Sequence, residues 1–81
     1  NPASREIFQP ALAVLNEIGE GADFDTFVNL LKPRVKARGK ELFMPLRMAL
    51  TGREHGPELK KIFPILGLAS VKRRLERALR S

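Results

Sequence analysis

Apolar residues recur at helical spacing along most of the chain, and prolines repeatedly interrupt them. Strand signals are weak, because there is no sustained alternation, no Asn-Gly or Asp-Gly turn and few β-branched residues. A proline lacks the backbone N–H and clashes with the carbonyl four residues earlier, so each one should begin, bend or end a helix. Four prolines fall inside the periodic stretches: Pro10, Pro33, Pro45 and Pro64. The sequence predicts an all-α fold, a small single-core bundle of about five short helices.

Two helices are expected in the first half of the chain. The apolar stripe over residues 8–18 predicts a first helix that either begins near Pro10 or bends there. The stripe over residues 24–35 predicts a second helix that kinks at Pro33 and ends at Gly39. Its first turn can be capped by either of two carboxylates, Asp23 or Asp25.

Three further helices are expected after Gly39. Residues 42–51 are apolar nearly all round, which predicts the most buried helix, with Pro45 in its first turn. The run Gly56-Pro57-Glu58 is a strong start signal for a fourth helix that ends at Gly67. Ser70 is predicted to cap the last helix. Since each helix is too short to persist alone in water, packing must hold them together.

The composition excludes several classes of function. A length of 81 residues predicts one domain, 1–81, and the opening Asn1-Pro2 indicates a piece of a longer protein. Without cysteine and with one histidine, disulfides, thiol catalysis and cysteine-ligated zinc are excluded, and no metal site is expected. No Gly-Lys-Ser/Thr triplet and no credible nucleophile–base constellation occur, so we expect no catalytic and no cofactor-binding residue. No run is apolar enough to cross a bilayer.

The charge is distributed unequally along the chain. Residues 1–31 carry one basic and five acidic side chains, whereas residues 32–81 carry fourteen basic and four acidic ones. Segregation of this kind makes one part of the surface cationic and favours a polyanionic partner. The alternative is a solvated basic face with no ligand. The arginines of the last helix fit that alternative, or they contact phosphates without reading sequence.

One arginine stands inside the apolar run of residues 42–51. Arg47 has no acidic residue closer in sequence than Glu41, and packed neighbours would hold its guanidinium as a fixed donor fork. The alternative is an ion pair with Glu41, Glu54 or Glu58. A polar turn follows that offers further donors and exposed backbone, at Gly52, Arg53, His55, Gly56 and Pro57. This combination suits nucleic-acid recognition better than catalysis.

The same stretch resembles a known family. The matching segments are Gly39-Lys40, Leu42-Phe43-Met44-Pro45-Leu46-Arg47, Ala49-Leu50-Thr51-Gly52 and His55-Gly56-Pro57-Glu58-Leu59. Together they resemble the C-terminal end of bacterial glutamyl-tRNA synthetases, in which a Lys-Gly-Lys-x-Leu-Phe-Met-Pro-Leu-Arg-x-Ala-Leu-Thr-Gly-x-x-His-Gly-Pro-Glu-Leu run is characteristic. The match is dense over residues 39–59, and it is looser through the basic last helix. Residues 1–38 match in pattern only.

The resemblance implies an all-α anticodon-binding domain of a class I aminoacyl-tRNA synthetase. The parent enzyme joins glutamate to tRNA(Glu), or also to tRNA(Gln), using ATP and Mg²⁺ bound in upstream domains. This fragment would bind tRNA but not charge it. We expect a cytoplasmic, monomeric protein.

The resemblance also assigns residues to the RNA site. The anticodon-binding set would be Arg47, Thr51, Gly52, Arg53, His55, Gly56 and Pro57, with Arg47 as the base reader. Some relatives have a threonine where Gly56 stands here, so only a backbone contact is expected at that position. A phosphate-binding track would comprise Arg34, Lys36, Arg38 and Lys40. Two alternatives are a helical protein-interaction module and a general basic nucleic-acid-binding domain.

Overall fold

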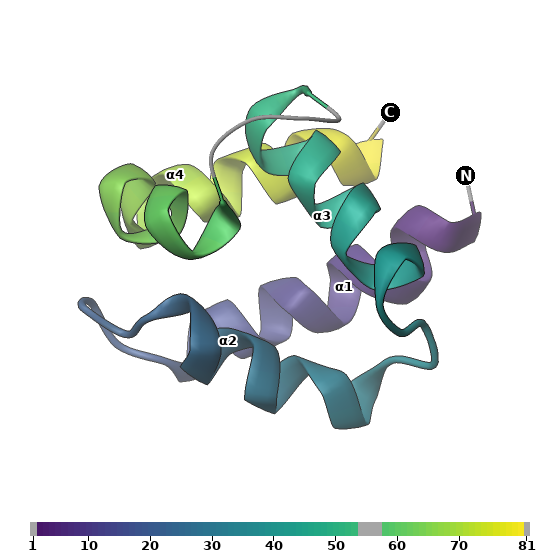
Figure 1. Ribbon diagram of the computed structural model, residues 1–81, viewed down its shortest axis with the longest axis horizontal. Helices are drawn as coiled ribbons and strands as arrows, with labels where there is room; N and C mark the ends of the chain where they lie inside the picture. Colours follow the sequence, from purple (N-terminus) through teal and green to yellow (C-terminus); the bar gives the residue numbers. More distant parts are fainter. Residues whose placement is uncertain (1, 54–57, 81) are drawn as a thin grey trace.

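The protein is described by a computed structural model that covers residues 2–53 and 58–80 (Figure 1). Its elements are α1 (Pro2–Glu17), α2 (Phe24–Leu31), the short 3-10 turn η1 (Lys32–Arg34), α3 (Lys40–Thr51) and α4 (Leu59–Arg80). In Figure 1, α1 and α2 form the lower half of the molecule, and α3 and α4 form the upper half. The all-α prediction is confirmed, because the described part of the chain contains no strand.

A single apolar core lies between these helices. Its largest fully buried side chains are Phe27, Leu15, Leu31, Leu42, Leu46, Leu50, Leu75, Val14 and Val71. Phe27 stacks on Phe63 with ring centroids 5.3 Å apart, and Phe24 meets the edge of Phe63 at 5.7 Å, which joins α2 to α4. No polar or charged side chain is buried among the described residues. The core is therefore held by apolar packing.

The first helix runs through its proline. α1 begins eight residues before Pro10 and continues to Glu17, so the alternative that the helix begins near Pro10 is wrong. Phe8 and Leu15 of the predicted stripe are buried, while Leu12 and Ile18 are partly buried against the core.

The second helix is shorter than expected, because Pro33 ends it instead of kinking it. α2 stops at Leu31, and the chain makes one 3-10 turn before Val35 becomes extended. Pro33 cannot donate the hydrogen bond that the next helical turn would need. Of the two candidate caps, Asp23 is the one used. Its carboxylate accepts the Thr26 amide at 2.9 Å and the Thr26 hydroxyl at 2.7 Å.

The third helix differs from the sequence prediction in two respects. α3 begins at Lys40, so Pro45 lies in its second turn and not in its first. It is also not buried on all sides. Its core-facing side chains are spaced by four residues, Leu42, Leu46 and Leu50, whereas Met48 on the opposite side is 43% exposed.

The fourth and fifth predicted helices correspond to the two parts of α4, which meet at a break in the helix at Gly67. Gly67 has φ 80° and ψ 159°, which is outside the helical region and disfavoured for a side chain with a Cβ. α4 is therefore two helical segments meeting at a kink, and the two-helix prediction holds in substance. Glu58 precedes the first segment, and its carbonyl accepts the amides of Lys61 and Ile62. The prediction that Ser70 caps the last helix is wrong, because Ser70 lies inside α4, three residues after the break at Gly67.

Substitution of Leu46 tests how much of the fold depends on α3. Leu46 has no exposed surface, so Leu46→Ala should lower the free energy of unfolding by about 2–5 kcal/mol. Ile65→Ala is the matched control, since Ile65 is 82% exposed and its loss should change that energy by less than about 0.5 kcal/mol. Urea unfolding followed by circular dichroism measures both. Equal stability of the Leu46 variant and the wild type would contradict the placement of α3.

Acid should weaken the cap of α2. The hydrogen bonds from the Thr26 side chain and amide lower the pKa of Asp23 below its ordinary value of 3.8. A carboxyl whose pKa is depressed on folding stabilises the protein above its unfolded pKa and ceases to do so as the pH falls through its folded pKa. The wild type should therefore lose melting temperature below about pH 4 more steeply than Asp23→Asn does. Parallel slopes for the two proteins would show that Asp23 does not contribute.

Candidate nucleic-acid interface

The C-terminal end of α3 presents several of the predicted anticodon-binding residues together. Gly52 ends the helix with φ 73°, and its amide donates to the Met48 carbonyl at 2.8 Å. The Thr51 hydroxyl donates to the Arg47 carbonyl at 2.8 Å and accepts the Arg53 amide at 3.1 Å. These bonds fix the turn that leaves α3. Thr51 thus has a structural task here, whatever it offers to a ligand.

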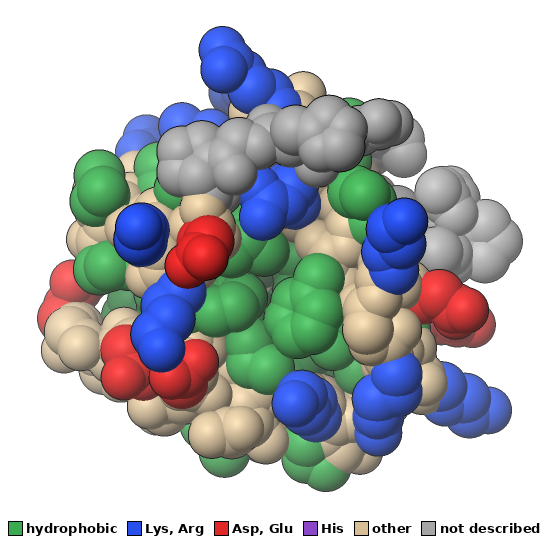
Figure 2. Space-filling view, viewed as in Figure 1, with side chains coloured by type: hydrophobic (Ala, Val, Ile, Leu, Met, Phe, Trp, Pro, Cys, Tyr) green, Lys and Arg blue, Asp and Glu red, His purple; other side chains and the backbone are tan. Residues whose placement is uncertain are grey.

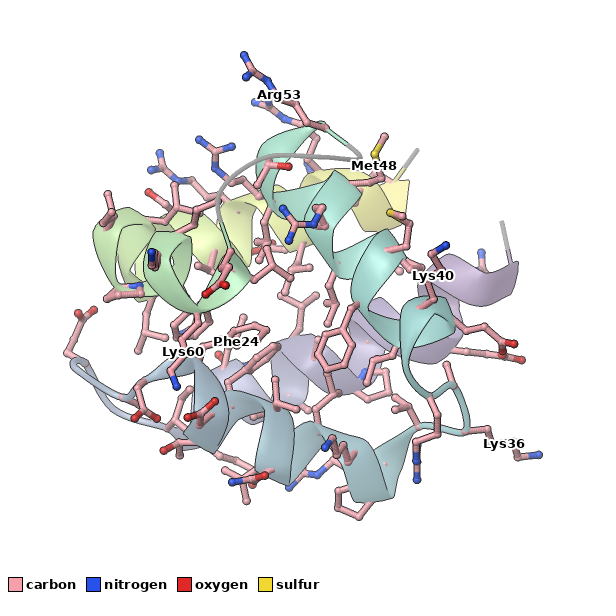
Figure 3. All side chains as sticks on the ribbon, viewed as in Figure 1. Phe24, Lys36, Lys40, Met48, Arg53 and Lys60 are labelled. Carbon is pink, nitrogen blue, oxygen red and sulfur yellow. The ribbon has the colours of Figure 1, made fainter. Side chains whose placement is uncertain are left out.

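Arg47 and Arg53 are the two arginines of this end of α3. Arg47 is half-buried, one turn before Thr51, so neighbouring side chains cover part of its length. Arg53 is exposed and projects from the end of the helix (Figure 3). The remaining predicted residues of the anticodon set, His55, Gly56 and Pro57, lie outside the described residues. The structure therefore brings together Arg47, Thr51, Gly52 and Arg53.

The predicted phosphate track divides into two kinds of residue. Arg34 donates from both terminal nitrogens to the Glu17 carboxylate, at 2.5 and 2.6 Å. This hydrogen-bonded pair lowers the pKa of Glu17 and raises that of Arg34. Arg38 donates to the carbonyls of Val35 and Ala37, at 2.7 and 2.9 Å. Both arginines thus make bonds that hold the chain around η1. The Glu17 carboxylate compensates the charge of Arg34, which argues against Arg34 as a phosphate contact.

The lysines of the track are differently placed. Lys36 and Lys40 are exposed, and Lys36 points away from the body of the protein (Figure 3). Neither makes an ion pair with another described residue. Figure 2 shows lysine and arginine side chains spread around this face, with apolar side chains between them. The available charges of the predicted track are therefore the two lysines and Arg38, whose bonds to neutral carbonyls leave its charge uncompensated.

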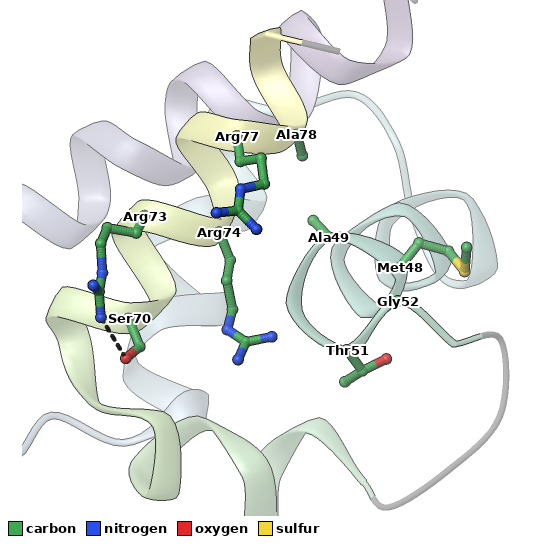
Figure 4. Close-up of a pocket in the computed structure, with 9 residues that line it drawn as sticks. All are labelled: Met48, Ala49, Thr51, Gly52, Ser70, Arg73, Arg74, Arg77 and Ala78. Carbon is green, nitrogen blue, oxygen red and sulfur yellow. Dashed lines mark hydrogen bonds between the residues drawn. The ribbon is translucent and has the colours of Figure 1, made fainter.

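A cleft lies between the C-terminal end of α3 and the second segment of α4 (Figure 4). Its volume is about 520 Å³, and its lining residues are Met48, Ala49, Thr51, Gly52, Ser70, Arg73, Arg74, Arg77 and Ala78. Within residues 2–53 and 58–80, no carboxylate lines the cleft. Arg74 donates to the Leu50 carbonyl at 2.8 Å, and Arg73 donates to the Ser70 hydroxyl at 3.3 Å. The cleft thus gathers three arginines next to Thr51 and Gly52.

From the sequence alone these arginines are either a solvated face or phosphate contacts, and the cleft that they form with the end of α3 is not predicted. The signal was present, because Ser70, Arg73, Arg74 and Arg77 stand at i, i+3, i+4 and i+7 and so share one side of a helix. The helical pattern alone does not say that the end of α3 lies opposite that side.

The described part of the chain offers neither a metal-binding cluster nor a membrane-spanning helix. Residues 2–53 and 58–80 hold no group of three or more His, Cys, Asp or Glu side chains that could bind a metal ion. Among the described helices, none has the length and apolar character needed to cross a membrane.

Comparison with known proteins identifies the family. The model of a family described as the anticodon binding domain matches residues 2–79. The chain belongs to the anticodon-binding domain family. No solved structure matches this domain significantly.

Curated relatives of the domain are much longer proteins. Glutamate–tRNA ligase 2 of Nitrosococcus oceani is 42% identical over 74 residues, which is 91% of this chain and 15% of the relative. Glutamate–tRNA ligase 2 of Syntrophus aciditrophicus is 54% identical over 56 residues, which is 69% of this chain and 12% of the relative. Glutamate–tRNA ligase 2 of Coxiella burnetii, strain RSA 493, is 39% identical over 71 residues, covering 88% of this chain and 15% of the relative. The chain thus spans about one seventh of the length of such relatives.

Proposed function

We propose that this domain recognises the anticodon of tRNA(Glu) as part of a glutamate–tRNA ligase. The observation that carries the proposal is the match of the anticodon-binding domain family to residues 2–79. The relatives named above are glutamate–tRNA ligases, and we infer the amino acid and the tRNA from their names. The half-buried arginine and the tight turn at the end of α3 supply suitable chemistry, since unstacked RNA bases are recognised by fixed donors and close backbone approach.

The rest of the reaction belongs to other parts of such an enzyme. ATP and Mg²⁺ would act in an upstream catalytic domain, with an upstream helical domain contacting another part of the anticodon. This domain would contribute affinity and selection. The enzyme would work as a cytoplasmic monomer, and tRNA(Gln) would be a second substrate if the parent does not discriminate.

Arg47 is the residue that we propose as the base reader. A guanidinium offers a planar pair of donors that matches two acceptors on one base edge. Its helix is anchored by Leu42, Leu46 and Leu50, which have at most 1% exposed surface, so the backbone that carries Arg47 is fixed. Arg53, at the exposed end, would add a donor that is less constrained.

Arg47→Ala should weaken selection among anticodons. The loss of one bidentate base contact corresponds to about 1–3 kcal/mol of discrimination at one anticodon position. The measurement is kcat/KM for aminoacylation of wild-type and anticodon-changed tRNA(Glu) by a full-length enzyme that carries this domain. Arg80→Ala is the control, because Arg80 is exposed at the far end of α4. Unchanged ratios for the Arg47 variant would refute the base-reading role.

Lys36→Ala should weaken binding of all RNAs by a similar factor. Removing one phosphate contact makes the slope of log K against log salt concentration shallower by about 0.7–0.9. Lys60→Ala is a matched control, because the Lys60 amine already pairs with Asp25 at 3.3 Å. Fluorescence anisotropy at several salt concentrations would measure both. If the two variants have the same slope as the wild type, Lys36 does not contact a phosphate.

A further inference from the structure

We propose that the cleft between α3 and the second segment of α4 binds a backbone phosphate of the RNA. The proposal rests on the proposed function, since it assumes that the partner is an RNA. It adds a second contact surface, made by Arg73, Arg74 and Arg77, that the anticodon set and the phosphate track do not include.

Two of the cleft arginines make hydrogen bonds within the protein. Arg74 is held by its bond of 2.8 Å to the Leu50 carbonyl, and Arg73 makes a longer bond of 3.3 Å to the Ser70 hydroxyl. An arginine has five N–H donors in a fixed fork, so each of these guanidinium groups keeps donors beyond the one it uses there. The Ser70 hydroxyl also keeps its proton to donate, since it acts as acceptor toward Arg73.

The charge of the cleft favours an anion. Three guanidinium groups share its lining with no carboxylate of the described residues, and no described acidic side chain forms an ion pair with Arg73 or Arg74. Arg34 shows the contrast, because the Glu17 carboxylate neutralises it. Like charges gathered on one surface repel each other, and a bound anion relieves that repulsion.

Capping of α3 does not explain the whole cluster. Arg74 satisfies one of the carbonyls that the end of a helix leaves unpaired, and it complements the negative end of the helix dipole. One donor suffices for that carbonyl. Arg73 bonds to Ser70 on its own helix and not to α3, yet its side chain lines the same cleft (Figure 4). Helix capping thus accounts for Arg74 but not for Arg73.

The geometry favours a phosphate of a nucleic acid over a small free anion. The cleft is open and large, about 520 Å³, so it admits a nucleotide-sized group. Arginine forks bind phosphate oxygens in pairs.

The cleft shares Thr51 and Gly52 with the predicted anticodon site, but Arg47 does not line it. Because successive residues of a helix are about 100° apart, Arg47 and the cleft residue Met48 point in different directions. An RNA strand would therefore cross the end of α3, with a base near Arg47 and a phosphate in the cleft.

The test compares two double variants with the same loss of charge. Arg73→Gln with Arg77→Gln removes two cations from the cleft, while Lys72→Gln with Arg80→Gln removes two cations of α4 that do not line it. The probe is a synthetic anticodon stem-loop of tRNA(Glu), and the same stem-loop with a changed anticodon is a second probe. We expect about tenfold or greater weakening by the cleft pair at low salt for both probes, with a shallower salt slope. The control pair should weaken binding by less than about threefold.

The outcomes separate this proposal from the proposed function. Equal losses for the two double variants, or no loss for the cleft pair, would overturn the cleft proposal while leaving anticodon selection intact. If the wild type does not prefer the cognate anticodon but the cleft pair still weakens both probes, the cleft proposal stands and anticodon recognition fails. No binding of either probe by the wild type overturns both. Competition by poly-glutamate as strong as that by RNA would show a site for acidic protein segments instead. Thermal melting of every variant confirms that each remains folded.

Discussion

One row of buried leucines fixes the orientation of α3 and therefore the position of its C-terminal end, where the proposed RNA-binding residues lie. Leu42, Leu46 and Leu50 are spaced by four residues, and they have at most 1% exposed surface. They insert α3 against α1 and α4, which contact each other as well. Because a close-packed interior leaves a helix little freedom to rotate, this row also fixes which residues face outward. As a consequence of that packing, Arg47 lies outside the cleft, whereas Ala49 lines it.

The basic residues of the chain are not one uniform surface. Arg34 and Arg38 hold the turn after α2, the first by a carboxylate and the second by backbone carbonyls. Arg74 holds the end of α3 while it also lines the cleft. Lys36 and Lys40 extend into solvent. A count of charges along the sequence cannot make this distinction, because a cation that is already paired attracts a polyanion less than an uncompensated one.

The parts of the fold that the sequence predicts are those set by local pattern. The all-α class, the stripes of α1 and α2 and the start of α4 follow from apolar periodicity and from capping residues. Prolines are less predictable, because their effect depends on whether packing supports the helix beyond them. The core packs against the helical residues of α1 beyond Pro10 and of α3 beyond Pro45, whereas the residue that the core buries after Pro33, Val35, is extended and not helical. The cleft could not be predicted, since it exists only where α3 and α4 meet.

The arrangement around α3 separates two tasks that RNA recognition requires. Phosphate contacts fix the register and orientation of an RNA but are the same for every sequence, whereas base contacts distinguish sequences only if the base is held in register. On our proposal, Arg47 performs the second task from α3, and the cleft arginines perform the first from α4. The cleft lies between these two helices and Arg74 bonds to the Leu50 carbonyl of α3, so a phosphate bound in the cleft would place the neighbouring nucleotides at a defined distance from Arg47. Selectivity would then depend on the rigidity of α3 as much as on the chemistry of its arginine.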